Sequence, residues 1–155
     1  MTLPGQVCAL LALSAAAALA ARALHPHPLP WRQNWSNQVA EQAAQTGVRL
    51  VTLTDTRAIV ERADHLLLDA RANRDYLAGH LPGAFSLPVL ELQTYLGQVL
   101  PLLSPAQPLL VYCSGTSCDE SIQLAKILQQ QGFTNLVLFA GGMAEWQKAG
   151  LQVEK

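Results

Sequence analysis

The chain has 155 residues, a formal net charge of −1 and three cysteines. This length suits one compact domain with a single hydrophobic core. The scattered Lys and Arg residues form no basic face that could neutralise a row of phosphates, so nucleic acid is not expected as a partner. Three cysteines are too few for a disulfide framework.

The first feature along the chain is an uncharged stretch rich in alanine and leucine, which ends at Arg22. Residues 3–24 reach the length of about 20 residues that a membrane-spanning helix needs. Residues 1–24 are therefore predicted to form one hydrophobic helix that makes the chain a single-pass membrane protein. Positive charge follows this segment rather than preceding it, which favours a cytoplasmic domain. The alternative is a secretory signal, cleaved near Ala20, that would send the domain to the periplasm.

Residues 25–47 are predicted to be a proline-rich connector. The sequence HPHPLP places a proline at every second position, which forbids a helix and favours extended backbone. His25 and His27 lie in this segment without a third ligand nearby. No metal site and no other cofactor is expected.

From Val48 to Lys155, short apolar runs alternate with longer amphipathic stretches, as in a parallel sheet with crossover helices. Strands are predicted at Arg49–Leu53, Leu66–Asp69, Ala84–Leu87, Leu109–Tyr112 and Leu136–Phe139. Helices are predicted at Thr54–Glu61, Leu90–Leu100, Glu120–Gln131 and Met143–Ala149, with a short helical turn at Arg74–Ala78. The fold class is therefore α/β, with a central, mainly parallel five-stranded sheet flanked by helices.

The fourth predicted strand leads into a candidate reactive thiol. The strand ends at Cys113, a short polar loop follows, and a helix begins near Asp119. The N–H groups of such a loop and helix N-terminus can converge on one point and favour a thiolate there. Open α/β folds also bind their ligands at the carboxyl ends of the strands. The alternative is that Cys113 is a small buried residue that ends a strand.

Three longer stretches extend this interpretation beyond the loop: LLLDARANRDYLAGHLPGAFSLP, VYCSGTSCDES and GFTNLVLFAGGMAEWQKAG. Together they resemble the rhodanese-like family of sulfurtransferase-like domains, over roughly residues 48–151. The resemblance implies a doubly wound fold in which Cys113 accepts a sulfane sulfur as a persulfide and passes it to a thiol acceptor. It also implies a loop cradle formed by Ser114, Gly115, Thr116, Ser117 and Asp119.

The resemblance assigns shaping roles to several other residues. Asp69, Arg71, His80, Pro82 and Gly83 match segments that the family uses mainly to form the fold beside the site. Residues 141 and 142, both glycine, and Trp146 match a tight turn and a packed aromatic without chemistry of their own.

The loop departs from the family in its charge and in a second cysteine. Between Cys113 and Lys126 the only charged residues are Asp119 and Glu120, which are expected to cap the following helix. Since the loop has no Lys or Arg that could bind anionic thiosulfate, the small sulfur donor is expected to be a different sulfane-sulfur compound. Cys118 follows Cys113 at a spacing that suits a resolving thiol. The alternative for Cys118 is a small residue packed under the loop.

The leading hypothesis is a membrane-tethered rhodanese-like protein that transfers sulfane sulfur or exchanges thiols through Cys113. Two alternatives stay open: a non-catalytic binding or regulatory module of the same fold, and a dithiol redox protein without sulfur transfer. The sequence identifies no protein partner.

Overall fold

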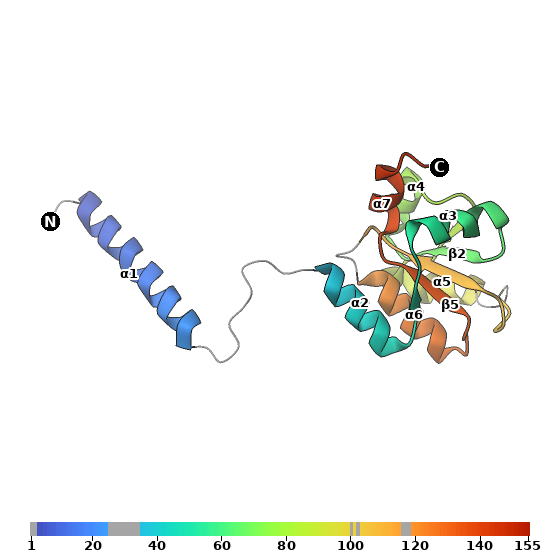
Figure 1. Ribbon diagram of the computed structural model, residues 1–155, viewed down its shortest axis with the longest axis horizontal. Coiled ribbons are helices and arrows are strands. Elements are labelled where there is room, and N and C mark those ends of the chain that lie inside the picture. Colours follow the sequence, from blue (N-terminus) through green and yellow to red (C-terminus); the bar gives the residue numbers. More distant parts are fainter. Residues whose placement is uncertain (1–2, 25–34, 100, 102, 116–118) are drawn as a thin grey trace. The chain divides into compact units, whose positions relative to one another are not determined.

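The computed structural model describes residues 3–24, 35–99, 101, 103–115 and 119–155. The chain divides between Gln33 and Asn34 into two units, which are described separately (Figure 1). The predicted cradle residues Thr116 and Ser117, the predicted resolving thiol Cys118, and residues 25–34 of the predicted connector lie outside the described residues.

Helix α1 (Leu3–Leu24) is the described element of the first unit. Its 20 residues Gly5–Leu24 contain an 18-residue window with a mean hydropathy of 2.0, so this helix is long and apolar enough to cross a membrane. A signal sequence has the same properties. The predicted N-terminal hydrophobic helix is thus confirmed as a helix.

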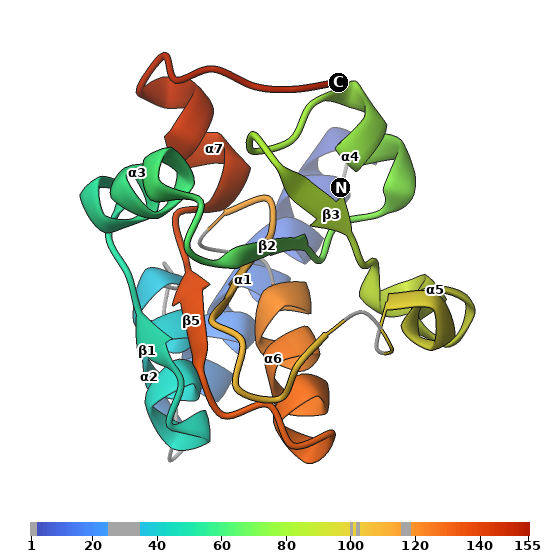
Figure 2. The ribbon, with the colours of Figure 1, turned by 90° about the vertical axis from the view of Figure 1, so that its right-hand side faces the viewer.

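The second unit is a five-stranded parallel sheet with helices on both faces (Figures 1 and 2). The strand order is β1-β5-β4-β2-β3, and every neighbouring pair is parallel. The strands are β1 (Arg49–Leu50), β2 (Leu66–Asp69), β3 (Ala84–Ser86), β4 (Leu109–Tyr112) and β5 (Leu136–Phe139). The helices are α2 (Trp35–Thr46), α3 (Leu53–Arg62), α4 (Asn73–Ala78), the 3-10 helix η1 (Val89–Glu91), α5 (Leu92–Val99), α6 (Glu120–Gln130) and α7 (Gly142–Lys148). The predicted α/β class is confirmed.

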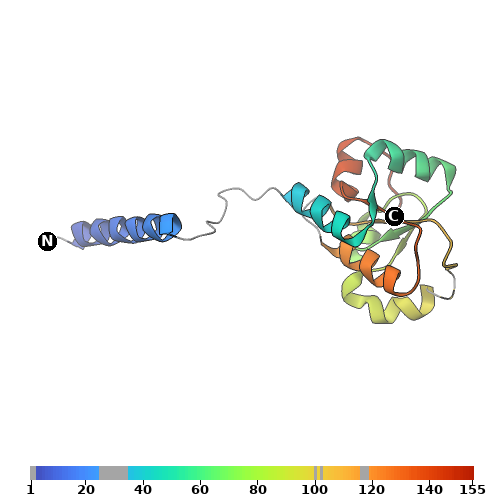
Figure 3. The ribbon, with the colours of Figure 1, turned by 60° about the horizontal axis from the view of Figure 1, so that its bottom comes forward.

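The alternation of side chains along the central strands divides the core into two halves. Leu109 and Val111 of β4 face a cluster that includes residues of α2, α5 and α6. Leu110 and Tyr112 face the opposite cluster, which includes residues of α3 and α7. All four residues of β4 are buried, as expected of a central parallel strand. Figure 3 shows α3 and α7 on one side of the sheet and α5 and α6 on the other.

Helix α2 lies in the range predicted to be a connector. Val39 and Ala43, one helical turn apart, are buried, and the side-chain nitrogen of Gln129 on α6 donates to the carbonyl oxygen of Thr46 at 3.0 Å. This part of residues 25–47 therefore belongs to the compact unit. The range also contains Gly47, whose positive φ of 69° ends the helix before β1.

Strand β1 is shorter than predicted because Thr52 caps a helix instead of extending the strand. The Thr52 hydroxyl accepts a hydrogen bond from the backbone N–H of Asp55, and the Asp55 carboxylate accepts one from the Thr52 N–H. This capping box starts α3 at Leu53. Strands β2, β4 and β5 have the predicted bounds, whereas the predicted helix Leu90–Leu100 is divided into η1 and α5.

Candidate active site

Cys113 follows β4, the middle strand of the sheet, at its carboxyl end. The residue is 1% exposed. Its Sγ accepts a hydrogen bond from the hydroxyl of Ser121, in the first turn of α6, at 3.4 Å, and lies 3.6 Å from the carbonyl oxygen of Gly115. Cys113 is disulfide-bonded in the structure, and Cys8, the other described cysteine, is free. The sulfur therefore lies beside the N-terminus of a helix, where the backbone dipoles favour negative charge.

The start of α7 supports the loop from the other side. The backbone N–H of Met143 donates to the carbonyl oxygen of Cys113 at 2.9 Å, and that of Ala144 donates to the carbonyl oxygen of Ser114 at 2.9 Å. This approach requires Gly142, because a Cβ there would overlap the carbonyl oxygen of Cys113 and lie 2.8 Å from the Gly115 nitrogen. Gly142 also has a positive φ of 54°. The second glycine of the Gly-Gly motif thus sets how closely α7 approaches Cys113.

A buried ion pair forms the wall next to Cys113. Asp69, at the end of β2, is 0% exposed and accepts hydrogen bonds from Arg71 Nη2 at 2.6 Å and Nε at 2.9 Å. Burial alone would lower the pKa of Arg71, but the hydrogen bonds and charge of Asp69 raise it, so the guanidinium stays charged. Burial, reinforced by the Asp69 charge, raises the pKa of Tyr112. Arg71 also donates to the carbonyl oxygen of Gly79 at 2.7 Å.

The C-terminal residues hold the segment that carries Gly79. His80 and Glu154 form an antiparallel bridge, with N–H to O distances of 2.9 and 3.0 Å. The Glu154 carboxylate also accepts from the Gly83 N–H at 2.8 Å. The His80 ring stacks on Tyr76 with centroids 3.8 Å apart, and its Nδ1 lies 3.0 Å from the Tyr76 carbonyl oxygen. These contacts are those of a buried residue that shapes the fold, which agrees with the role inferred for His80.

Two cavities open beside the loop and share Arg71, Asp75 and Ser114. The larger, with a volume of about 350 Å³, is completed by Ala78, Gly79 and Gln147. The smaller, of about 190 Å³, also reaches Arg74, Leu90 and Glu120. Space for a small molecule therefore lies next to the residue that follows Cys113.

Of the predicted cradle, Ser114 is exposed at both cavities and Gly115 packs near Gly141 and Ala144. Asp119 stands at the N-cap position of α6 but makes no side-chain capping hydrogen bond, because its backbone is already helical, with φ of −88° and ψ of −13°. The expected capping role of Asp119 is therefore wrong. Glu120 begins α6 and lines the smaller cavity.

Ser121, Gln147 and the site-facing role of Arg71 were not identified from the sequence. Ser121 could have been suspected, because a hydroxyl in the first turn after a cysteine loop is close to the sulfur. Gln147 belongs to α7. The position of α7 beside the loop depends on tertiary packing, so the sequence around Gln147 does not reveal it.

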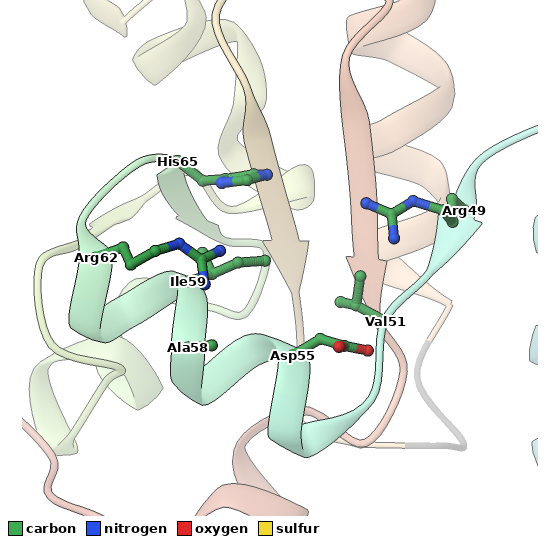
Figure 4. A pocket seen from close by; sticks show the side chains of 7 residues that line it. All are labelled: Arg49, Val51, Asp55, Ala58, Ile59, Arg62 and His65. Carbon is green, nitrogen blue, oxygen red and sulfur yellow. The ribbon is translucent and has the colours of Figure 1, made fainter.

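Another cavity, of about 150 Å³, is lined by residues of β1, of α3 and of the segments on either side of α3 (Figure 4). Arg49, Asp55, Arg62 and His65 line it together with the apolar Val51 and Ile59. Arg62 Nε and His65 Nδ1 each lie 2.6 Å from the carboxylate of Asp64. The hydrogen bond from Arg62 holds the pKa of Asp64 below its usual range.

Comparison with known proteins agrees with this arrangement. Residues 52–149 match the Rhodanese-like domain family. The chain is 24% identical over 129 residues to the thiosulfate:glutathione sulfurtransferase of Saccharomyces cerevisiae, covering 75% of this chain and 90% of the yeast protein. It is 32% identical over 95 residues to an HTH-type transcriptional regulator of Mycobacterium tuberculosis, covering 61% of this chain but only 40% of the regulator.

Solved structures show the same fold. A thiosulfate sulfurtransferase from Pseudomonas aeruginosa superposes with a TM-score of 0.60 at 24% identity, covering 77% of this chain and 22% of the larger protein. The human single-domain sulfurtransferase superposes with a TM-score of 0.57 at 23% identity, covering 65% of this chain and 96% of that protein. The family match spans most of the second unit, including the cysteine loop and the Gly-Gly turn that supports it. The chain therefore belongs to the family of rhodanese-like domains.

Proposed function

We propose that the domain transfers sulfane sulfur through a persulfide on Cys113, with Cys118 as the resolving thiol. The observation that carries the proposal is the surroundings of Cys113 Sγ. It lies at the carboxyl end of the central strand, accepts a hydrogen bond from Ser121 at 3.4 Å, and adjoins two cavities through Ser114. A hydroxyl donor and a helix N-terminus both favour the thiolate and the persulfide anion.

In the proposed reaction, the thiolate of reduced Cys113 attacks the outer sulfur of a donor R–S–SH. The S–S bond of the donor breaks, R–S⁻ leaves and takes up a proton from solvent, and Cys113 becomes a persulfide. An acceptor thiolate then attacks the outer sulfur of this persulfide and regenerates the Cys113 thiolate. Each of these steps exchanges one S–S bond for another, so no external oxidant or reductant is consumed. When Cys118 resolves the persulfide instead, its thiolate attacks the inner sulfur on Cys113, HS⁻ leaves, and a thiol reductant reopens the resulting disulfide.

We propose that the domain is held to a membrane by residues 3–24, with the domain on the cytoplasmic side. The support is the length and hydropathy of α1 and the position of Arg22 in its last turn. Cleavage of the segment and release of the domain to the periplasm is the alternative.

Dithiol redox chemistry without sulfur transfer is the second candidate function. The observation that favours it is the disulfide bond of Cys113. A resolving cysteine can convert a sulfenate or a persulfide on Cys113 into a disulfide, which a reductant then opens. The two functions predict different products from the same protein and can be separated by mass.

The test is the intact mass of the reduced full-length chain in detergent after incubation with thiosulfate, with a persulfide donor, or with a mild oxidant. Cys113→Ser and Cys118→Ser are compared with Cys8→Ser, a matched control in the other unit. Sulfur transfer predicts a gain of one sulfur mass that only Cys113→Ser abolishes. A chain that gains no sulfur from any donor, but loses two hydrogens on oxidation unless Cys113 or Cys118 is replaced, would establish the redox alternative instead.

A further inference from the structure

The two cavities beside Cys113 are lined by side chains of both charges. Arg71, Arg74 and Asp75 come from the end of β2 and from α4, and Glu120 comes from α6. The Arg74 guanidinium lies 3.6 Å from the Asp75 carboxylate, and these two side chains are 87% and 49% exposed. A ligand in the smaller cavity can therefore reach a cationic and an anionic group on two adjacent residues of α4.

Among the described residues, these walls carry no surplus of positive charge. Arg71 is paired with the buried Asp69 at 2.6 Å, and Arg74 with Asp75, so each guanidinium has a carboxylate partner. Glu120 adds a further negative charge to the smaller cavity. A doubly charged anion such as thiosulfate therefore gains little net attraction here, whereas a zwitterion can place each of its charges against an opposite one.

We propose that this site selects amino-acid thiols and their persulfides, with Arg74 facing the carboxylate and Asp75 facing the ammonium group of the ligand. The proposal rests on sulfur transfer through Cys113 and deepens it by naming the substrate class. Arg74 and Asp75 then act as specificity-determining residues. Arg71 lines the same cavity as Arg74, Asp75 and Ser114. Its guanidinium is held in place by hydrogen bonds to Asp69 and to the carbonyl oxygen of Gly79.

The cavities agree with a ligand that extends beyond the reacting sulfur. The larger one is lined by Ser114, by Asp75 on α4 and by Gln147 on α7. Its volume of about 350 Å³ is within the range of small-molecule pockets. Leu90, 89% exposed at the smaller cavity, offers apolar contact to the carbon chain of the ligand.

Three persulfides that differ only in their charged groups test the proposal: cysteine persulfide, cysteamine persulfide, which lacks the carboxylate, and 3-mercaptopropionate persulfide, which lacks the ammonium group. The rate of sulfur loading on Cys113 of the reduced full-length chain is followed by intact mass at low donor concentration. Cysteine persulfide is expected to load about fivefold faster than either singly charged analogue, the worth of one exposed ion pair.

Two substitutions connect this preference to its residues. Asp75→Asn is expected to slow loading from cysteine and cysteamine persulfides by about fivefold and to leave 3-mercaptopropionate persulfide unchanged. Arg74→Gln is expected to slow the two carboxylate-bearing donors by a similar factor and to spare cysteamine persulfide. Arg57→Gln and Glu61→Gln are the matched controls, because that pair is also exposed and close, at 2.7 Å, but lies on α3 outside both cavities.

The outcomes separate this inference from sulfur transfer itself. Equal loading from all three donors, or equal effects of Asp75→Asn on each of them, would overturn the assigned specificity while leaving the persulfide on Cys113 intact. Loading that is fastest from thiosulfate would overturn it as well. If Cys113 gains sulfur from no donor, the sulfur-transfer proposal itself fails.

Discussion

Ser121 and Gly142 act on Cys113 from two different helices. Ser121 lies in the first turn of α6 and donates to the sulfur, while Gly142 allows α7 to reach the carbonyl oxygens of Cys113 and Ser114. Ser121 therefore contacts the Cys113 sulfur itself, whereas Gly142 affects the shape of the loop. Substitutions at the two positions should therefore have different signatures.

Ser121→Ala should slow the reaction of the reduced Cys113 thiol without unfolding the domain. The alanine removes a hydroxyl donor from a buried sulfur that needs negative charge to react, so the thiolate fraction near neutral pH falls. The expected change is about tenfold in the rate of alkylation by iodoacetamide, the worth of one hydrogen bond to a charged group. Ser121→Thr keeps a hydroxyl and should restore most of the rate. Unchanged alkylation in Ser121→Ala would mean that this hydrogen bond has no catalytic role.

Gly142→Ala should destabilise the domain and abolish most of the sulfur loading. The added methyl group overlaps the backbone of Cys113 at a position that already has a positive φ of 54°. The expected cost is about 2 kcal/mol or more in the free energy of unfolding by urea. Gly150→Ala is the matched control, since Gly150 has a similar φ of 69° but nothing within 4 Å of an added Cβ. Similar losses in both variants would show that backbone strain, rather than the contact with the loop, explains the effect.

At the residue scale, the sequence predicted Cys113 because a strand, a loop and a helix follow one another without interruption. It could not predict that Met143 and Ala144 bind the loop, since this depends on where α7 lies in three dimensions. The sequence also predicted that no cation lies near Cys113, but that prediction considered only the residues between Cys113 and Lys126. Arg71, distant in sequence, lines both cavities.

At the element scale, the strands with continuous apolar residues were predicted with their correct bounds, because all residues of β4 and β5 and the last three of β2 are buried. Helix α2 was missed because its sequence WSNQVAEQAAQT is mostly polar and follows a proline-rich stretch; among its described side chains, Val39 and Ala43 are buried. The end of β1 was misplaced because Thr52, a good strand former, has a stronger role as a helix cap.

Thr52→Ala should destabilise the domain by about 1 kcal/mol through loss of the capping box of α3. The hydrogen bonds from Thr52 lower the pKa of Asp55 below its ordinary value of 3.8. Because a depressed carboxyl pKa stabilises the fold only where the unfolded chain is already ionised, this contribution is present near neutral pH and is lost as pH falls below 3.8. Urea unfolding should therefore show a difference between wild type and Thr52→Ala that shrinks on acidification. Thr54→Ala, at an exposed helix position, is the control and should show no such pH dependence.

At the scale of the whole molecule, we expect the first unit to determine membrane association and the second unit to carry the chemistry. The full chain should remain with membranes after alkaline extraction, whereas a chain lacking residues 1–24 should be released, because α1 supplies the hydropathy of a span. Fractionation and immunoblotting measure this. A full chain that is recovered in the soluble fraction with a new N-terminus near residue 21 would instead establish cleavage of a signal segment.

The order of the strands has a consequence for how the domain matures during synthesis. β5 lies between β1 and β4, so the first strand of the sheet finds its neighbour only after the last strand has left the ribosome. The amides that hold the Cys113 loop, from Met143 and Ala144, emerge later still. In a nascent chain, Cys113 is therefore exposed to solvent before the residues that cover it have been synthesised. A chain that ends before α7 has the cysteine but lacks the hydrogen bonds that shape its loop.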